Sequence, residues 1–410
     1  MEKRNVPKLR FKGFEDEWKK DILSDLVDRV VRKNKDNVTK RPLTISAQYG
    51  LIDQEEFFNK IVASKNLEGY YLLNKGEFAY NKSYSTGYPI GAIKRLDKYE
   101  NGAVSTLYIC FKNKKNMNSD FLVQYFESDK WHKEISMIAV EGARNHGLLN
   151  ISVSDFFDTI HSVPSLEEQT KIANFLSRVD KIIEEQDLKV KDLELYKKGM
   201  MQKIFKQEIR FKDDNGENYP KWEEKSLSEL GDFYRGYSYT SNDTSTTGLL
   251  VLRSNNIDNN KINYDSLQFV NGMCKEELKL KNKDILICMS NGSKNLVGKS
   301  AEFIYSKDSY KDITVGAFCS IYRSKNVLSK YLLQTQNYKN YLSILLAGTN
   351  INNLKNSDLE KLTFYIPNNI EEQTKIANFL SNIDKIIEEE NKKLEDLRLW
   401  KKGLLQQMFV

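Results

Sequence analysis

The sequence has few of the residues that build metal sites and catalytic centres. Its 410 residues include only three histidines, four cysteines and six prolines. The cysteines (Cys110, Cys274, Cys288 and Cys319) show no C-x-x-C spacing, so we expect reduced thiols and no zinc site. Paired metal-binding carboxylates, a nucleophile with a base at recognisable spacing, and an H-E-x-x-H sequence are missing as well. Because no two prolines are adjacent, the Asn/Asp-Pro-Pro-aromatic signature of amino-methyltransferases cannot be present. Together these absences favour a binding protein, with no catalytic residues, over an enzyme.

Long hydrophobic runs are also missing. No apolar stretch approaches the roughly 20 residues of a membrane span, and the basic N-terminus lacks the apolar region of a signal peptide. We therefore expect a cytoplasmic protein. The formal charge is +6, from 63 basic and 57 acidic residues, which is compatible with a nucleic-acid partner but does not require one.

One stretch resembles a nucleotide-binding motif without matching it. Residues 292–300, GSKNLVGKS, place five residues between Gly292 and Gly298, whereas the P-loop has four. The following SAEFIY reads as a strand, although the motif needs a helix N-terminus to receive phosphates. We expect no nucleotide to bind here.

A long internal repeat is the main positive feature. EEQTKIANFLS occurs at 167–177 and again at 371–381, and only three residues differ between 167–186 and 371–390. The same offset relates Trp18 to Trp222, and an RFK tripeptide recurs at 10–12 and 210–212. Because solenoid repeats run roughly 20 to 50 residues, this long period indicates a duplication of one body followed by one tail.

Each tail is predicted to be a long helix. Ser165 begins an S-x-x-E capping box, and Asn369 begins the equivalent sequence in the second copy, so a side-chain oxygen and a glutamate would satisfy free amide groups reciprocally. Apolar residues then recur at spacings of three and four, which is a heptad seam for a partner helix. The seams are Ile172, Leu176, Val179, Ile183, Val190 and Leu193, and Ile376, Leu380, Ile383, Ile387, Leu394 and Leu397.

The two matching seams suggest that the tails pair with each other. Their connections to separate bodies allow an antiparallel coiled coil, with each helix of 40 residues about 60 Å long. Gln186 and Glu390 interrupt the seams at the same point and could fix the register. Further apolar residues flank the seams, and they either cover the helix pair and touch the bodies or form a face for partner helices. The candidate partner-binding residues are Phe175, Ile182, Tyr196, Phe379, Ile386 and Trp400.

The bodies read as mixed, strand-rich domains, which makes the fold class α+β. Residues 70–83 predict two strands joined by a turn. Residues 280–290, which also contain a turn, occupy the equivalent place in the second copy. AVSTLYICF at 103–111 and TVGAFCSIY at 314–322 each predict a buried strand, and short helical stretches follow at 120–131 and 330–341. The frame repeats while the loops differ, as expected for two binding domains that read different targets.

The loops carry side chains suited to nucleic acid. Arg and Lys can bridge guanine edges, Asn can bridge adenine, and Ser and Tyr reach phosphates, although Asn/Ser/Gly clusters also form ordinary turns. The candidate DNA-binding residues are Lys82, Ser83, Tyr84, Lys94, Arg95, Arg144, Asn145, His146, Arg235, Tyr237, Arg253, Asn255, Asn291, Ser293, Lys294, Asn350 and Asn352.

These features closely resemble the DNA-specificity (S) subunits of type I restriction-modification systems. The resemblance spans almost the whole chain and rests on the repeated EEQTKIANFLS…DKII segments, with less specific support from residues 76–96 and 283–301. It implies target-recognition domains at 1–164 and 207–368, and conserved helices at 165–206 and 369–410, in a pseudo-two-fold arrangement.

The resemblance also implies the function and the partners. Each domain would read one half of a split, asymmetric double-stranded DNA target, and the helices would act as a ruler across the unread spacer. The helices would also dock two modification (methyltransferase) subunits, with restriction (endonuclease and translocase) subunits joining outside. S-adenosylmethionine, ATP and magnesium would belong to those partners, with no cofactor on this chain.

Two other classes of function stay open from the residues alone. One is an enzyme with nuclease or nucleotide-dependent activity in the bodies, which would bind ATP or cleave DNA by itself. The other is a coiled-coil adaptor with protein ligands only, which would protect no DNA with or without its partners.

Overall fold

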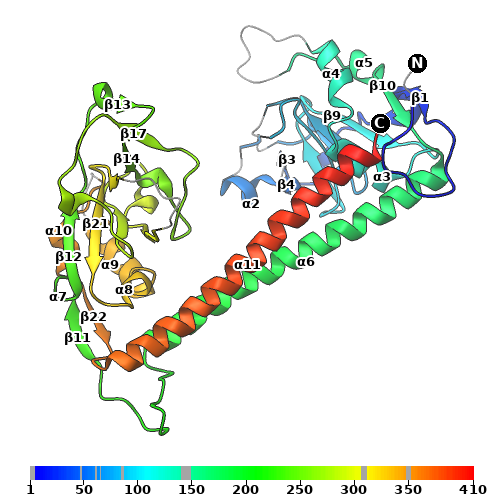
Figure 1. Ribbon diagram of the computed structural model, residues 1–410. Coiled ribbons are helices and arrows are strands. Elements are labelled where there is room, and N and C mark those ends of the chain that lie inside the picture. The colour runs from blue at the N-terminus through cyan, green and yellow to red at the C-terminus, as the bar shows by residue number, and fades with distance from the viewer. Residues whose placement is uncertain are drawn as a thin grey trace. The chain divides into compact units, whose positions relative to one another are not determined.

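A computed structural model describes residues 5–46, 49–60, 62–64, 66–84, 87–139, 149–305, 312–347 and 352–410. The chain divides into two compact units, residues 1–188 with 391–410, and residues 189–390. Each unit combines one strand-rich body with half of each of two long helices, α6 (Leu166–Phe205) and α11 (Ile370–Met408) (Figure 1). The two units are therefore described separately.

The first body consists of short strands and short helices. Its strands are β1 (Lys19–Ile22), β2 (Val27–Arg29), β3 (Leu43–Ser46), β4 (Gly50–Asp53), β5 (Tyr71–Asn74), β6 (Phe78–Asn81), β7 (Ala92–Arg95), β8 (Asn101–Val104), β9 (Ile109–Asn113) and β10 (Ile160–Val163). Its helices are α1 (Leu23–Leu26), the 3-10 turn η1 (Lys35–Asn37), α2 (Gln54–Phe58), α3 (Ser119–Glu127), α4 (His132–Ile138) and α5 (Val153–Phe157).

The second body repeats this plan with additional short elements. Its strands are β11 (Glu223–Ser226), β12 (Gly231–Arg235), β13 (Thr244–Ser245), β14 (Leu249–Leu252), β15 (Ile257–Asp258), β16 (Lys261–Ile262), β17 (Gln268–Val270), β18 (Ile285–Cys288), β19 (Ser300–Glu302), β20 (Ile313–Val315), β21 (Cys319–Ser324) and β22 (Thr363–Ile366). Its helices are α7 (Leu227–Leu230), α8 (Ser329–Leu332), α9 (Gln336–Ala347) and α10 (Asn356–Glu360), with 3-10 turns η2 (Ser241–Asp243), η3 (Ser254–Asn256), η4 (Glu276–Leu278) and η5 (Lys294–Leu296).

The same four-stranded sheet occurs in both bodies. Its strand order is β2-β9-β6-β7 in the first body and β12-β21-β18-β19 in the second, and every pair is antiparallel. In the first body, α3 confirms the helix that the sequence predicts at 120–131, directly after the last strand of this sheet. In the second body the predicted stretch is divided into α8 and α9.

The prediction of one strand over 103–111 and one over 314–322 was wrong. Each segment forms two strands that belong to different sheets, β8 and β9 in the first body and β20 and β21 in the second. The break falls at Ser105 and Gly316, where the chain turns from one sheet into the other. At Gly316 the backbone of Gly236 passes so close that a Cβ on Gly236 would lie 2.1 Å from the Gly316 carbonyl oxygen. In the second body the break thus coincides with a close packing of two backbones, which strand propensity does not report.

The predicted helix starts are confirmed, although only half of each capping box forms. Ser165 Oγ accepts from the Glu168 amide at 3.3 Å, and Asn369 Oδ1 accepts from the Glu372 amide at 3.2 Å. The two glutamates do not complete the predicted box, because both carboxylate oxygens of Glu168 accept from Arg10, and both of Glu372 accept from Arg210. A charge-assisted bidentate pair is stronger than a neutral amide donor, so the arginine takes the carboxylate.

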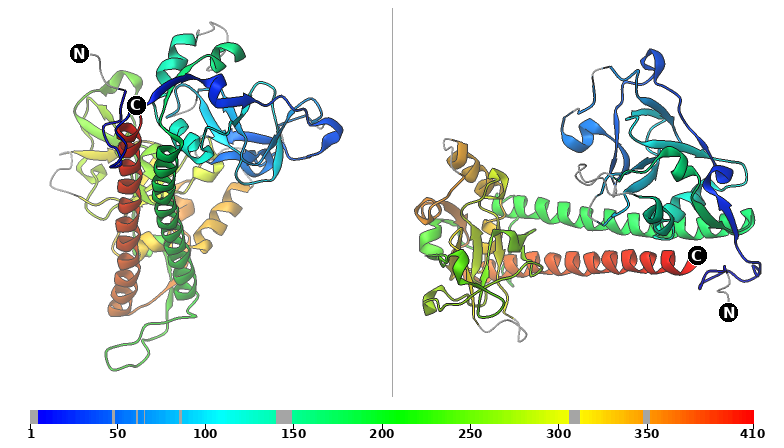
Figure 2. Two further views of the ribbon diagram at one scale, coloured as in Figure 1. Left: turned by 90° about the vertical axis from the view of Figure 1, so that its right-hand side faces the viewer. Right: turned by 90° about the horizontal axis from the view of Figure 1, so that it is seen from above.

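The two helices run antiparallel within each unit, as Figures 1 and 2 show. In the first unit Asp180 of α6 pairs with Lys401 of α11, and Asp187 pairs with Arg398. In the second unit Lys189 pairs with Glu390, and Lys197 with Asp384. As the residue number along α6 rises, the residue number of its partner on α11 falls, so the two helices are antiparallel. Most of the predicted seam is buried, namely Ile172, Leu176, Val179, Val190, Ile376, Leu380, Ile383 and Leu394.

Buried aromatic and aliphatic side chains join each helix pair to its body. In the first unit Phe409, at the end of α11, contacts Trp18, Phe121 and Tyr125 at ring-centroid distances of 6.3, 5.4 and 5.9 Å. In the second unit Phe205, at the end of α6, contacts Trp222 at 6.4 Å. Since Phe205 and Phe409 are equivalent in the repeat, each body is held by the same part of the helix motif.

A buried histidine makes the first unit sensitive to acid. His161 of β10 lies 2.7 Å from Tyr125 Oη through Nδ1 and 2.8 Å from Thr159 Oγ1 through Nε2, and burial lowers its pKa to about 4. The unfolded chain, with a histidine pKa of about 6.5, then binds more protons than the folded chain between these values. The free energy of unfolding is expected to be independent of this group above about pH 6.5. It should fall on acidification towards pH 4 by up to about 3 kcal/mol.

The measurement is urea unfolding of the wild type and His161→Phe at pH 7.5, 6 and 5. Phenylalanine suits the position because Phe364 occupies it in the second body, where β22 pairs with β11 as β10 pairs with β1. The stability difference between the two proteins should shift in favour of His161→Phe as the pH falls. A difference that is constant with pH would contradict the assignment.

Candidate nucleic-acid interface

In the second body, several predicted residues meet at one edge of the sheet. The carboxyl ends of β12 and β18 lie beside the start of β21, where Arg235 is opposite Ser320 and Cys288 is opposite Cys319. The end of β14 joins them, because it pairs in parallel with β20, which leads into the same turn. We call this the loop edge of the second body, and it comprises residues 235–239, 253–256, 289–296, 316–318 and 352–354.

Hydrogen bonds hold these loops to one another. Asn291 Nδ2 donates to Ser254 Oγ at 3.3 Å, and Asn352 Nδ2 donates to the Gly292 carbonyl at 3.2 Å. Asn291 Oδ1 also accepts from the Ser293 amide at 2.9 Å. Arg253 lies beside the 316–318 turn and donates from Nη2 to the Ser266 carbonyl. The structure thus brings Arg235, Arg253, Asn255, Asn291, Ser293, Lys294 and Asn352 to one edge. The Tyr237 side chain instead packs against Leu249, Val251 and Val270, with its hydroxyl beside Gly272.

The first body has the equivalent edge. β6 ends at Asn81 beside the start of β9, and Tyr80 pairs with Ile109. Lys82 donates from Nζ to the Ile151 carbonyl at 3.0 Å, and its own carbonyl accepts from the Leu149 amide. The loop edge of the first body comprises residues 82–84, 105–108 and 149–151, and it contains the predicted Lys82, Ser83 and Tyr84. Arg144, Asn145, His146 and Asn350 lie outside the described residues.

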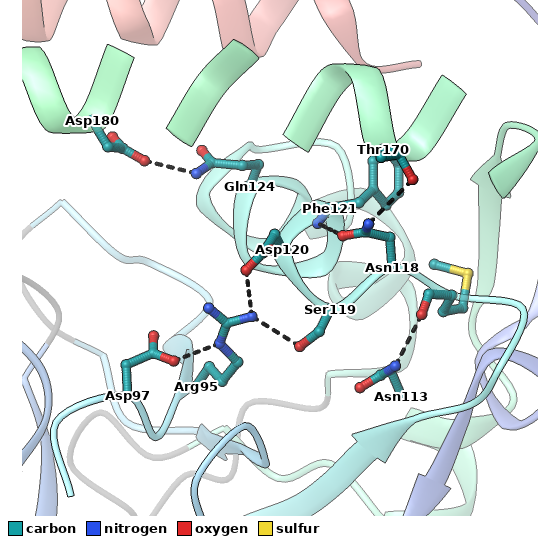
Figure 3. A network of polar contacts seen from close by, with 11 residues as sticks. Arg95, Asp97, Asn113, Asn118, Ser119, Asp120, Phe121, Gln124, Thr170 and Asp180 are labelled. Atoms are coloured by element: carbon teal, nitrogen blue, oxygen red, sulfur yellow. Dashed lines mark hydrogen bonds and ion pairs between the residues drawn. The ribbon is translucent and has the colours of Figure 1, made fainter. Parts of the chain in front are cut away.

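Lys94 and Arg95 are not brought to the loop edge. They lie on β7, which runs away from that edge and pairs Arg95 with Phe78 at the start of β6. Lys94 forms an ion pair with Glu127. Arg95 donates to Asp97 at 2.7 Å, to Asp120 at 2.8 Å and to Ser119 at 2.9 Å (Figure 3). Their cations are therefore paired within the domain at the opposite edge of the sheet.

That opposite edge collects carboxylates in both bodies. In the first body, Glu77 precedes β6, Asp97 follows β7 and Glu100 precedes β8, and no acidic residue occurs in 78–96 or 101–119. In the second body, Asp284 precedes β18, Glu302 ends β19 and Asp312 precedes β20, and no acidic residue occurs in 285–301 or 313–324. We call this the carboxylate edge. Its six carboxylates pair with Arg32, Arg95, Lys75, Arg323, Lys330 and Lys279 in that order.

Because the carboxylates lie at the opposite edge of the sheet, the loop edge carries cationic and uncharged polar side chains. Arg235 and Lys294 are exposed there, together with amide and hydroxyl side chains, and the residues that form the loop edge include no carboxylate. Phosphate repels carboxylates and attracts Lys and Arg, while Asn, Ser and Tyr form hydrogen bonds with phosphates and base edges. The loop edge can therefore bind a polyanion that carries hydrogen-bonding groups.

The P-loop-like segment contributes to this edge without being a phosphate cradle. β19 follows it directly, as the sequence predicts, so no helix begins where the motif would need one. Among the described residues, no group of three or more His, Cys, Asp or Glu could hold a metal ion. In the same residues, no helix is long and apolar enough to cross a membrane.

A polar network fixes each body on the helices. Asp180 of α6 accepts from Gln124 Nε2 of α3 at 2.7 Å as well as pairing with Lys401 (Figure 3 shows the α3 contact). The equivalent Asp384 accepts from Tyr331 Oη at 3.2 Å and pairs with Lys197. One aspartate in each unit therefore joins both long helices to a helix of the body, which fixes the orientation of the body on its helix pair.

Comparison with known proteins places the sequence in a family. The family model of the type I restriction modification DNA specificity domain matches residues 15–191 and again residues 219–398. The chain belongs to this family.

Several relatives carry the same description. The chain is 31% identical over 185 residues to the StySPI specificity subunit of Salmonella potsdam, and 31% identical over 175 residues to the EcoKI specificity subunit of Escherichia coli. It is 29% identical over 257 residues to the MjaVIII specificity subunit of Methanocaldococcus jannaschii. These matches cover 43%, 40% and 59% of this chain, and 39%, 37% and 59% of the respective relatives. The chain thus spans well under two thirds of the length of these relatives.

Solved structures support the fold over the full length. The S subunit of a type I restriction-modification system from M. genitalium superimposes with a TM-score of 0.55 at 16% identity, covering 99% of both chains. A chain from a study of complex assembly and conformational transition in a type I R-M system gives a TM-score of 0.56 at 18% identity, covering 96% of this chain and 97% of the other. The α+β fold with two strand-rich domains and two long helices is shared with them.

Proposed function

We propose that the protein is the non-catalytic DNA-specificity subunit of a type I restriction-modification complex. Each body would read one half of a bipartite, asymmetric double-stranded DNA target through its loop edge. The observation that carries this proposal is the repeated loop edge, which has the same place in both bodies, no carboxylate among the described residues that form it, and different side chains in each copy. A duplicated reader whose two copies have diverged suits a target whose halves differ.

The helices supply a surface for two modification subunits. Leu195 and Tyr196 on α6 are more than half exposed, and so is Leu399 on α11, while Trp400 is 46% exposed. Ile182 and Ile386 are also exposed at equivalent places. In the first unit Trp400 contacts Phe175 at a ring-centroid distance of 6.5 Å, and Phe175 in turn contacts Phe11 at 5.8 Å. An exposed apolar patch that recurs on both helices is typical of protein interfaces, where Trp and Tyr are enriched.

Trp400→Asp is expected to weaken binding of one modification subunit by at least about tenfold. The aromatic contact is lost and a charge is introduced, whereas the half-exposed position limits the loss of folding stability. The measurement is the stoichiometry of the co-purified complex by light scattering, which should fall from two modification subunits to one. Leu188→Asp is the matched control, because Leu188 is also 53% exposed on α6 but corresponds to a lysine, Lys392, in the repeat. An unchanged stoichiometry in Trp400→Asp would place the docking surface elsewhere.

The remaining roles follow from this assignment. The paired helices would set the unread spacer between the half-sites, and restriction subunits would join the modification subunits. S-adenosylmethionine, ATP and magnesium would be bound by those partners, and the complex would act in the cytoplasm on DNA. Lys94 and Arg95 would support the frame of the first body, because both are paired with carboxylates.

The deciding experiment is co-expression with the cognate modification subunit, followed by mapping of the methylated bases. A single split motif with a fixed gap is expected, and exchange of one body should change one half of it only. If the complex assembles but methylates without sequence preference, the assignment fails in favour of an adaptor. If the isolated chain hydrolyses ATP or cleaves DNA, it fails in favour of an enzyme.

A further inference from the structure

Two apolar side chains are exposed at the same place in the two loop edges. Leu107 lies in the turn between β8 and β9, and Phe318 lies in the turn between β20 and β21. The residues are equivalent, because Val104 and Val315 end the preceding strands and each apolar residue follows three positions later. Their exposed fractions are 68% and 69%. An exposed apolar residue alone is ordinary, but its recurrence at the tip of a duplicated turn calls for a function.

The position of Phe318 is held by backbone contacts. Its carbonyl accepts from the Met289 amide at 2.8 Å and from the Ser290 amide at 3.2 Å. The turn is thus bound to the loop that carries Asn291 and Ser293, and Arg253 lies next to Gly316 of the same turn. The Leu107 turn is closed by Ser105, whose Oγ accepts from the Leu107 amide at 3.2 Å. Each apolar side chain therefore projects from a fixed turn among hydrogen-bonding residues.

The chemistry of the major groove supplies a partner for such a side chain. Base edges there present hydrogen-bond donors and acceptors together with one apolar group, the C5-methyl of thymine. Side chains of the Asn and Arg type read the polar groups, and an apolar side chain between them reads the methyl. We propose that Leu107 and Phe318 each contact a thymine methyl group in one half of the target. This inference rests on the proposed function, because it assigns specificity residues to the same loop edges.

The test uses the complete methyltransferase complex, assembled with wild-type, Leu107→Ala or Phe318→Ala subunits. Methylation maps should show that each variant relaxes the preference for thymine at one position, in opposite halves of the motif. Because the change is confined to one half, it cannot arise from general misfolding. Met273→Ala is the control, since Met273 is 94% exposed but follows β17 at the carboxylate edge.

A binding measurement then identifies the group contacted. Replacing the selected thymine by uracil removes only the methyl, and it should weaken wild-type binding by about fourfold, in line with the loss of one buried methyl group. The same replacement should leave the affinity of the alanine variant unchanged. The inference is overturned if the alanine variants keep the wild-type motif, or if the wild-type complex is insensitive to uracil at every thymine. By contrast, a wild-type complex that shows no split motif would defeat the proposed function itself.

Discussion

Replacing Arg210 with alanine is expected to lower the free energy of unfolding of the second unit by about 3 to 5 kcal/mol, because it leaves a buried carboxylate without its cation. The Glu372 side chain is fully buried, and its oxygens accept from Arg210 Nε at 3.1 Å and Nη2 at 2.8 Å. Trp222 Nε1 also donates to Glu372 at 3.1 Å, so the carboxylate keeps one hydrogen bond, from an uncharged donor, in the variant. Urea denaturation monitored by circular dichroism measures the loss.

The double variant Arg210→Ala/Glu372→Gln supplies the control, because it removes the buried charge along with its partner. It should recover part of the stability lost in the single variant. The first unit offers an internal comparison. There Arg10 holds Glu168 by the same bidentate contact, but Trp18 Nε1 has no hydrogen-bond partner among the described residues. Arg10→Ala should therefore cost at least as much as Arg210→Ala. A loss below about 1 kcal/mol in both variants would contradict a structural role for these pairs.

The double charge reversal Arg235→Glu/Lys294→Glu is expected to weaken binding of the assembled complex to its DNA target by about 100-fold at moderate salt. Both residues are exposed at the loop edge of the second body, and the reversal places two carboxylates among loop-edge residues that include none. The logarithm of the binding constant should also depend less steeply on the logarithm of the salt concentration, by about two units of slope. Fluorescence anisotropy across a salt series measures both effects.

Lys275→Glu/Lys325→Glu is the matched control for net charge. Both lysines are about four-fifths exposed and lie at the carboxylate edge, where Lys275 is near Glu277 and Lys325 is near Asp232. This variant should bind DNA within about threefold of the wild type, because its charges are remote from the loop edge. Equal losses in the two variants would show that net charge, and not the loop edge, governs binding.

Parts of the fold that depend on local chemistry could be predicted from the sequence. The two long helices could be predicted from the caps at Ser165 and Asn369 and from the heptad seams, because both signals depend only on residues three or four positions apart. The duplication was visible in the sequence itself, and it predicted that the frame of one body recurs in the other while the loops differ. The loop residues Arg253, Asn291 and Asn352 were recognised by chemical type, although nothing in the sequence showed that they meet.

Other features could not be predicted because they depend on contacts between distant segments. The RFK repeats were visible, but the bond from Arg10 to Glu168 spans 158 residues, and it displaces the reciprocal capping box that local spacing suggested. The sequence places Leu107 and Phe318 in the interior of a predicted strand, since a short polar or glycine break within an apolar run resembles an ordinary buried strand. When the two copies are aligned, residues 105–107 (STL) match residues 316–318 (GAF). This shared interruption of the apolar run was the one indication in the sequence that a turn lies there.

By itself, the sequence determined that this protein consists of two copies of one body followed by one long helix, because repetition, capping and heptad spacing are properties of the chain read in order. The tertiary structure alone decided which charged residues face outward together. Lys82 and Lys94 lie only 12 residues apart, yet one follows β6 at the loop edge and the other lies on β7, paired with Glu127. Antiparallel pairing reverses the chain between them, and the direction of the chain separates the loop edge from the carboxylate edge.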